Sequence, residues 1–109
     1  MDDKTFNLLF TEALTASDRD VFVSEWAGSS LFAGDPDGPG PDLAALVPEL
    51  ERVYDLAHLS VREIRQRAGL TQAAFGLRYC IPRRTLEDWE AGRRLCPPYV
   101  RLLLARSAE

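Results

Sequence analysis

Residues 71–92 read TQAAFGLRYCIPRRTLEDWEAG, a stretch in which two short helical patterns meet at a tight corner. Thr71 can cap the first helix, because its hydroxyl accepts a hydrogen bond from a backbone N–H that has no partner within the helix. Pro82 biases Ile81 away from helical geometry and suits the first position of a second helix. Gly92 ends the second helix, since glycine readily adopts the left-handed conformation found at helix ends. The stretch therefore predicts two helices joined by a short turn.

The second helical pattern, from Arg83 to Glu90, has an inward face and a charged face. Leu86 and Trp89 stand three residues apart and are expected to pack against the first helix. We interpret Trp89 as a core side chain rather than one that stacks on a base. The first pattern supplies residues that favour a helix or pack in a core, namely Ala73, Ala74, Phe75 and Leu77.

Residues 58–104 as a whole resemble the Cro/repressor helix-turn-helix family, whose members are also called xenobiotic-response-element-like regulators. The likeness rests on three segments, Leu70-Thr71-Gln72-Ala73, Ile81-Pro82-Arg83-Arg84-Thr85-Leu86 and Trp89-Glu90-Ala91-Gly92. The string Tyr79-Cys80-Ile81-Pro82 also resembles small repressor-like proteins of bacterial mobile elements. The resemblance implies an all-α, lambda-repressor-like bundle that places the second helix of its motif in the major groove of double-stranded DNA. It implies a transcriptional regulator that binds DNA as a homodimer, and not an enzyme.

The resemblance also implies roles for individual residues. A glutamine in the position of Gln72 contacts the DNA backbone at the start of the first helix of the motif. Residues in the positions of Arg83, Arg84 and Asp88 face the groove, and the basic residue after the glycine, Arg93, lies near phosphates. The candidate DNA-binding residues are Gln72, Arg83, Arg84, Thr85, Asp88, Arg93 and Arg94.

Side-chain chemistry leaves two of these roles open. Arginine suits guanine O6 and N7 as well as phosphates, so Arg83 and Arg84 are expected to carry both affinity and specificity. Thr85 has two interpretations of equal weight, contact with a phosphate or a thymine methyl group, or a cap on its own helix. Asp88 can accept a hydrogen bond from cytosine N4 or hold Arg84, four residues earlier, in place; we favour the second role.

Three positions depart from the family pattern. Ala74 replaces a glutamate, so a capping box is lost. Gly76 replaces the usual alanine where the two helices touch, at a cost of about 1 kcal/mol within a helix. Cys80 stands where the turn usually has a glycine, and a cysteine with positive φ would be strained. We therefore expect the turn to differ locally.

Charge is distributed unevenly along the 109 residues, whose net charge is −4. Residues 1–57 contain three basic and twelve acidic residues, a net charge of −9. Residues 58–109 contain ten arginines and five acidic residues, a net charge of +5. Phosphate binding depends on such a local basic region more than on the total charge. The sequence predicts an acidic helical region at 1–57 and a DNA-binding domain at 58–109.

The acidic region is expected to contain three helical segments around a loop. An amphipathic pattern predicts a helix over residues 4–16, and Ser17 is expected to begin a second helix that Gly28 ends. Residues 34–41, Gly-Asp-Pro-Asp-Gly-Pro-Gly-Pro, predict a loop, which Leu31 and Phe32 are expected to anchor by packing. A third helix is expected over residues 42–57, with Pro48 kinking it or starting a fresh helix.

The basic region is expected to begin and end with further helices. Ser60 and Glu63 form a capping box before a helix that Gly69 ends. Cys96-Pro97-Pro98 is expected to start a last helix with a packing stripe of Val100, Leu103 and Leu104. With the two helices of the motif, the chain predicts about seven helices and no strand.

Several kinds of site and cellular setting are disfavoured. Two cysteines and one histidine are too few for an ordinary zinc site, so no metal or cofactor is expected. His58 has no accompanying group that suggests catalysis. Neither a membrane span nor a secretory signal is expected, which favours the cytoplasm. We interpret Cys80 and Cys96 as small buried packing residues, with a disulfide as the minor alternative.

The acidic half is the part that the motif does not explain. One interpretation is a helical cover that packs on the DNA-binding bundle and enlarges its core. The other is a surface for dimerisation or for a protein partner, as in small repressor-like antitoxins. The alternative function is accordingly an antitoxin-like or adaptor protein whose N-terminal half binds a protein partner.

Overall fold

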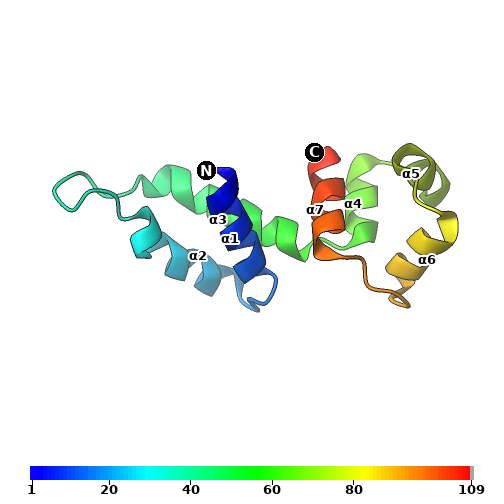
Figure 1. The fold of residues 1–109 in the computed structure, drawn as a ribbon, viewed down its shortest axis with the longest axis horizontal. Coiled ribbons are helices and arrows are strands. Elements are labelled where there is room, and N and C mark those ends of the chain that lie inside the picture. Colours follow the sequence, from blue (N-terminus) through cyan, green and yellow to red (C-terminus); the bar gives the residue numbers. More distant parts are fainter. Residues whose placement is uncertain (109) are drawn as a thin grey trace. The chain divides into compact units, whose positions relative to one another are not determined.

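The computed structural model describes residues 1–108, and every regular element in that range is helical (Figure 1). The prediction of an all-α fold is confirmed. The α-helices are α1 (Asp3–Ala13), α2 (Arg19–Ala27), α3 (Leu43–His58), α4 (Val61–Ala68), α5 (Gln72–Tyr79), α6 (Arg83–Ala91) and α7 (Pro98–Ser107), and the short 3-10 helix η1 is Ser30–Phe32. The chain divides into two compact units, Met1–His58 and Leu59–Glu109.

In the first unit, α1 and α2 both pack on α3. The apolar residues of α1 recur at the spacing of a helix with one buried face, and Leu9 and Leu50 are completely buried where α1 and α3 supply the core. Burial of each such side chain stabilises the fold by about 1.5–3 kcal/mol. The core of this unit consists of Phe6, Leu9, Phe10, Ala13, Phe22, Val23, Leu46, Leu50, Val53, Leu56 and Ala57.

The second helix begins later than the sequence suggested. Asp18, and not Ser17, is the N-cap, because its carboxylate accepts a hydrogen bond from the Val21 N–H at 3.0 Å. The next residue, Arg19, donates from Nε and Nη1 to Asp55 and Glu51 at 2.9 and 2.8 Å. These bonds attach the first turn of α2 to α3.

Helix α3 runs from Leu43 to His58 as one element with Pro48 inside it. Of the two alternatives for Pro48, a fresh helix after Val47 is wrong, because α3 continues through the proline. A proline at this position removes one backbone donor, while Leu46, Leu50 and Val53 on both sides of it are buried in the same core. Packing of the whole face therefore holds the helix together across the proline.

The segment before α3 is exposed. Residues 34–41 contain a turn in which Gly38 N–H donates to the Asp35 carbonyl at 2.9 Å. Leu31 is 44% exposed and Phe32 is half-buried, so the expected anchoring of the loop by Leu31 is wrong.

In the second unit, α4 contacts α6 and α7, and α5 contacts α6 (Figure 1). Local signals set the ends of these helices as the sequence predicted. Ser60 and Glu63 form the capping box of α4, the Thr71 hydroxyl caps α5 by accepting from Ala74 N–H at 3.1 Å, and Gly92 ends α6 in the left-handed conformation. The buried side chains include Val61, Ile64, Phe75, Leu86, Cys96, Leu104 and Ala105.

Helix α7 packs through a face that only partly matches the one expected. Leu104 and Ala105 are buried, whereas Leu103 is 64% exposed. The stripe of Val100, Leu103 and Leu104 is therefore only partly correct, because Leu103 lies outside the face that contacts α4. The two cysteines also differ, since Cys96 is buried but Cys80 is exposed, and both are free thiols.

A buried carboxylate joins three helices of the second unit. The side chain of Glu90 on α6 is 1% exposed and accepts hydrogen bonds from Arg65 Nη2 at 2.9 Å and Nε at 3.0 Å, both on α4. Arg62 Nε lies 3.4 Å from the same carboxylate, and the Gln72 side chain at the start of α5 also bonds to it. Burial acts to raise the pKa of Glu90, but the hydrogen bonds from Arg65, Gln72 and Arg62 outweigh it and lower the pKa.

Candidate nucleic-acid interface

The turn between α5 and α6 keeps a tight geometry despite its cysteine. Cys80 has φ 56° and ψ 38°, in the left-handed region. Its N–H and that of Ile81 both donate to the carbonyl of Gly76, the latter at 2.9 Å. The expectation that the turn would differ is wrong, because these hydrogen bonds hold Cys80 in a conformation that costs a non-glycine residue about 1–2 kcal/mol.

Gly76 allows the chain to return closely over the end of α5. A Cβ atom built at this position would lie only 2.9 Å from the carbonyl oxygen of Ile81 and 3.9 Å from Leu86 Cδ2. A contact of 2.9 Å with backbone requires a shift of the turn. Glycine is therefore needed here, and its propensity cost is offset by close packing of the turn.

Helix α6 buries one side and exposes its first turn. Pro82 is the N-cap, with φ −55° and ψ 136°, so the helix begins one residue after the proline rather than at it. Leu86 is completely buried, while Trp89 is half-buried, which confirms the inward face only in part. The side chains of Arg83 and Arg84 are 71% and 88% exposed. The first turn of α6 therefore presents two guanidinium groups to solvent.

These arginines make only loose contacts within the protein. Arg83 Nε lies 3.1 Å from Glu87 Oε1, one helical turn away, and Arg84 Nε lies 4.0 Å from Asp88 Oδ2. Exposed ion pairs of this kind contribute about 0–1 kcal/mol. Both guanidinium groups can exchange these partners for stronger acceptors at little cost.

Asp88 is the buried member of the charged face. Its carboxylate accepts from Arg93 Nε at 2.7 Å, and Arg94 Nε lies 3.9 Å away. The hydrogen bond from Arg93 is the main reason why the pKa of Asp88 is lowered. The geometry thus supports the structural role for Asp88 and extends it, because Arg93 is held more closely than Arg84.

Gln72 and Thr85 are both half-buried, but they differ in their hydrogen bonds. Gln72 is the first residue of α5, is half-buried, and bonds to Glu90 through its side chain. Thr85 is half-buried in the first turn of α6, where no side-chain capping bond occurs among the residues that the structure describes. The capping role left open for Thr85 is therefore not seen.

An apolar hollow lies beside this charged surface and was not foreseen. It has a volume of about 510 Å³ and includes Gly76 and Leu77 of α5 together with Ile81 and Pro82. Leu77 lies in α5 but is 84% exposed, so of its two expected roles it serves the helix and does not pack in the core. The recurrence of small and apolar residues at 73, 76, 77 and 80, the spacing of one helix face, was the available signal.

We also searched the described residues for a metal site and for a membrane-spanning helix, and located His58. Residues 1–108 contain no cluster of three His, Cys, Asp or Glu side chains arranged to hold a metal ion. Within the same residues, no helix is both long and apolar enough to cross a membrane. His58 lies at the end of α3, with Nε2 2.7 Å from the Ala13 carbonyl oxygen and its ring stacked on Tyr54 at 4.1 Å.

Comparison with known proteins found a family match, within the second unit. Residues 61–103 match the family model described as Helix-turn-helix. The match runs from the start of α4 into α7 and confirms the resemblance to Cro/repressor proteins. Searches of curated proteins and of solved structures found no match to the chain.

Proposed function

Because residues 61–103 form a helix-turn-helix domain of the Cro/repressor type, we propose that this protein is a transcriptional regulator that binds a specific sequence of double-stranded DNA. The observation that carries the proposal is the first turn of α6, where Arg83 and Arg84 are exposed while Leu86 on the opposite side is fully buried. A helix held this way can enter the major groove with its N-terminal residues at the base edges.

We assign specificity to Arg83 and Arg84, and affinity to the arginines around them. A bidentate arginine–guanine contact discriminates against the wrong base by about 1–3 kcal/mol. Arg93 and Arg94, whose side chains are 62% and 69% exposed, are assigned to phosphates. Gln72 is assigned to the DNA backbone, and Thr85 to a phosphate or a thymine methyl group.

We propose that the protein acts as a homodimer in the cytoplasm. Paired half-sites about one helical turn apart, roughly 34–36 Å, match the two-fold symmetry of such a dimer. Residues 58–109 are assigned to DNA binding. The acidic residues 1–57, with a net charge of −9, are repelled by phosphates and are assigned to a surface that faces away from DNA.

Selection from a random duplex pool tests this function. The full chain is incubated with the pool at about 50 mM salt, where phosphate contacts are strong, and bound duplexes are sequenced. We expect one enriched motif with two inverted half-sites, lost in the variant Arg83→Ala/Arg84→Ala. The control Arg67→Ala/Arg106→Ala removes the same charge from α4 and α7 and should retain the motif. Absence of any duplex binding at this salt concentration would refute the proposal.

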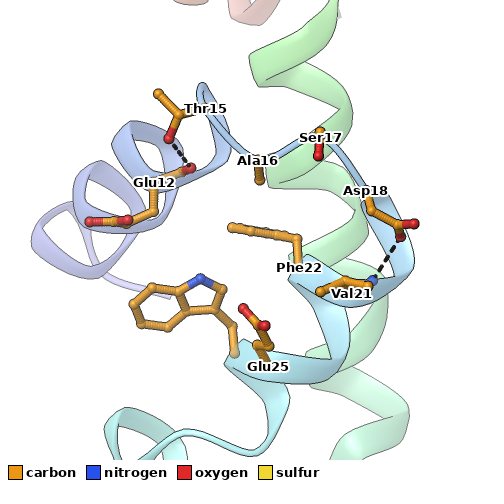
Figure 2. A pocket seen from close by; sticks show the side chains of 9 residues that line it. Glu12, Thr15, Ala16, Ser17, Asp18, Val21, Phe22 and Glu25 are labelled. Atoms are coloured by element: carbon orange, nitrogen blue, oxygen red, sulfur yellow. Dashed lines mark hydrogen bonds between the residues drawn. The ribbon is translucent and has the colours of Figure 1, made fainter.

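A second candidate function is binding of a basic protein partner by the acidic unit. The observation that favours it is a hollow of about 320 Å³ at the turn between α1 and α2 (Figure 2). Figure 2 shows the Phe22 ring and the Glu25 carboxylate at this hollow, whereas the Asp18 carboxylate points to the Val21 N–H that it caps. Glu12 and Val21 also line it, and both side chains are exposed.

The two functions predict different results. An adaptor or antitoxin-like protein would show no motif enrichment and would purify with a stoichiometric basic partner. Glu25→Lys, which reverses a charge inside the hollow, should then release that partner. Retention of the partner by this variant would exclude the hollow as its binding site.

A further inference from the structure

The apolar hollow beside α6 is continuous with the proposed DNA contacts. Its floor and walls come from one face of α5 and from the turn, namely Ala73, Gly76, Leu77, Cys80, Ile81 and Pro82. Gln72 and Arg83 complete the lining. The first is assigned to the DNA backbone and the second to a base edge, so a duplex bound by both residues passes over the hollow.

The exposed surface of the hollow is mainly hydrocarbon. Leu77 is 84% exposed, and Cys80 is also exposed with a free thiol. A single exposed leucine is common in soluble proteins, but here Leu77 adjoins the apolar wall of Ile81 and Pro82. Gly76 has no side chain, because the Ile81 carbonyl oxygen lies too close to leave room for a Cβ atom. The hollow is therefore not filled at this position.

We propose that this hollow receives the C5-methyl group of a thymine, so that the protein reads an A·T pair beside the base contact of Arg83. The inference rests on the proposed DNA-binding function. Thymine is the only one of the four bases that carries an apolar group into the major groove. A phosphate or a cytosine edge held against Leu77 and Ile81 would lose hydration on that side.

The hollow complements what the arginines can read. Arginine selects guanine through O6 and N7, so Arg83 and Arg84 distinguish G·C pairs and supply little information at A·T pairs. An apolar pocket adds recognition of thymine at a neighbouring position. Leu77 is thereby a specificity-determining residue.

Replacement of thymine by deoxyuridine tests the inference, because it removes only the methyl group. In the duplex selected by the full chain, each thymine is replaced in turn by deoxyuridine and the dissociation constant is measured. We expect one position in each half-site at which the wild-type protein binds about fourfold more weakly, the factor that burial of one methyl group contributes. Leu77→Ser should bind the thymine and uracil duplexes equally.

The control variant is Leu103→Ser, which changes an equally large but remote exposed leucine and should keep the full thymine preference. Both leucines are more than half exposed, at 84% and 64%, so neither change removes a core side chain. Three results would overturn the inference. They are no uracil effect at any position, a uracil effect that persists in Leu77→Ser, and a selected motif without thymine. Loss of all duplex binding would instead refute the proposed function and the inference together.

Discussion

Asp88 on α6 and Arg93 in the following turn are joined by a hydrogen bond of 2.7 Å between Oδ1 and Nε. The same two residues are also joined through the backbone, where the Arg93 N–H donates to the Asp88 carbonyl at 2.9 Å. Arg84 and Arg94 lie farther from the other carboxylate oxygen, at 4.0 and 3.9 Å, so Asp88 holds Arg93 closely and the other two arginines weakly. A surface assigned to phosphates therefore contains a fixed negative charge.

Asp88→Asn is expected to separate affinity from specificity. Loss of the negative charge should strengthen binding to a random duplex by a few-fold, roughly the effect of one more phosphate contact. Loss of the restraint on Arg93, and of the weaker attraction on Arg84 and Arg94, should weaken discrimination of the selected motif. Titrations of both duplexes across a series of salt concentrations measure the two effects.

The pattern of lost discrimination identifies the role of Asp88. A structural role predicts weaker preference at several positions of the half-site. Relaxation at a single C·G pair would instead show that Asp88 accepts a hydrogen bond from cytosine, and would contradict the structural role.

Glu90 is expected to make the second unit sensitive to acid. Its lowered pKa means that the carboxylate stabilises the fold fully above the ordinary pKa of a glutamate, and that this stability is lost as the pH falls through the lowered value. The melting temperature should therefore decrease when the pH is lowered below about 4. Glu90→Gln leaves Arg65 without its buried partner and should cost about 3–5 kcal/mol at neutral pH.

Thermal unfolding followed by circular dichroism between acid and neutral pH checks both parts. The variant should unfold at a lower temperature than the wild type and show a smaller dependence on pH. Glu87→Gln is the control, since Glu87 is the exposed partner of Arg83 on the same helix. An unchanged acid profile in Glu90→Gln would contradict the role assigned to Glu90.

Gly76→Ala is expected to destabilise the protein although alanine favours helices. The helix propensity gains about 1 kcal/mol, but the new Cβ would lie 2.9 Å from the Ile81 carbonyl oxygen. Displacing the backbone of the turn should cost more than this gain, for a net loss of about 1–2 kcal/mol. Chemical denaturation measures the free energy of unfolding, and a net stabilisation would show that the turn can move freely.

Cys80→Gly is expected to stabilise the protein. Glycine removes the strain of the left-handed conformation at φ 56°, and this gain is partly cancelled by the greater freedom of glycine in the unfolded chain. The net increase in the free energy of unfolding should be about 0.5–1 kcal/mol. Cys96→Gly, at a buried position, should have the opposite sign, and equal effects at both positions would refute the strain at Cys80.

Much of the second unit followed from local signals. Ser60, Glu63, Thr71 and Gly92 act on backbone groups within about four residues of themselves, so their roles can be inferred without knowing the fold. The same holds for the exposed pair Arg83 and Arg84, since Leu86 marks the opposite face of their helix. The local signal of Pro48 did not decide the structure. Burial of the apolar face on both sides of the proline outweighed the lost backbone hydrogen bond, and the helix continues.

The sequence alone therefore determined the helices, the helix-turn-helix motif and the side of α6 that is charged, because hydrogen bonding and periodicity act over a single turn. Tertiary structure decided which apolar residues stay exposed. Leu77 and Leu103 are apolar residues of the kind found in cores, yet both are more than half exposed. Tertiary structure also brought together Glu90 of α6, Arg65 of α4 and Gln72 of α5, and it placed the Ile81 carbonyl against Gly76. Such contacts depend on how the helices pack on one another.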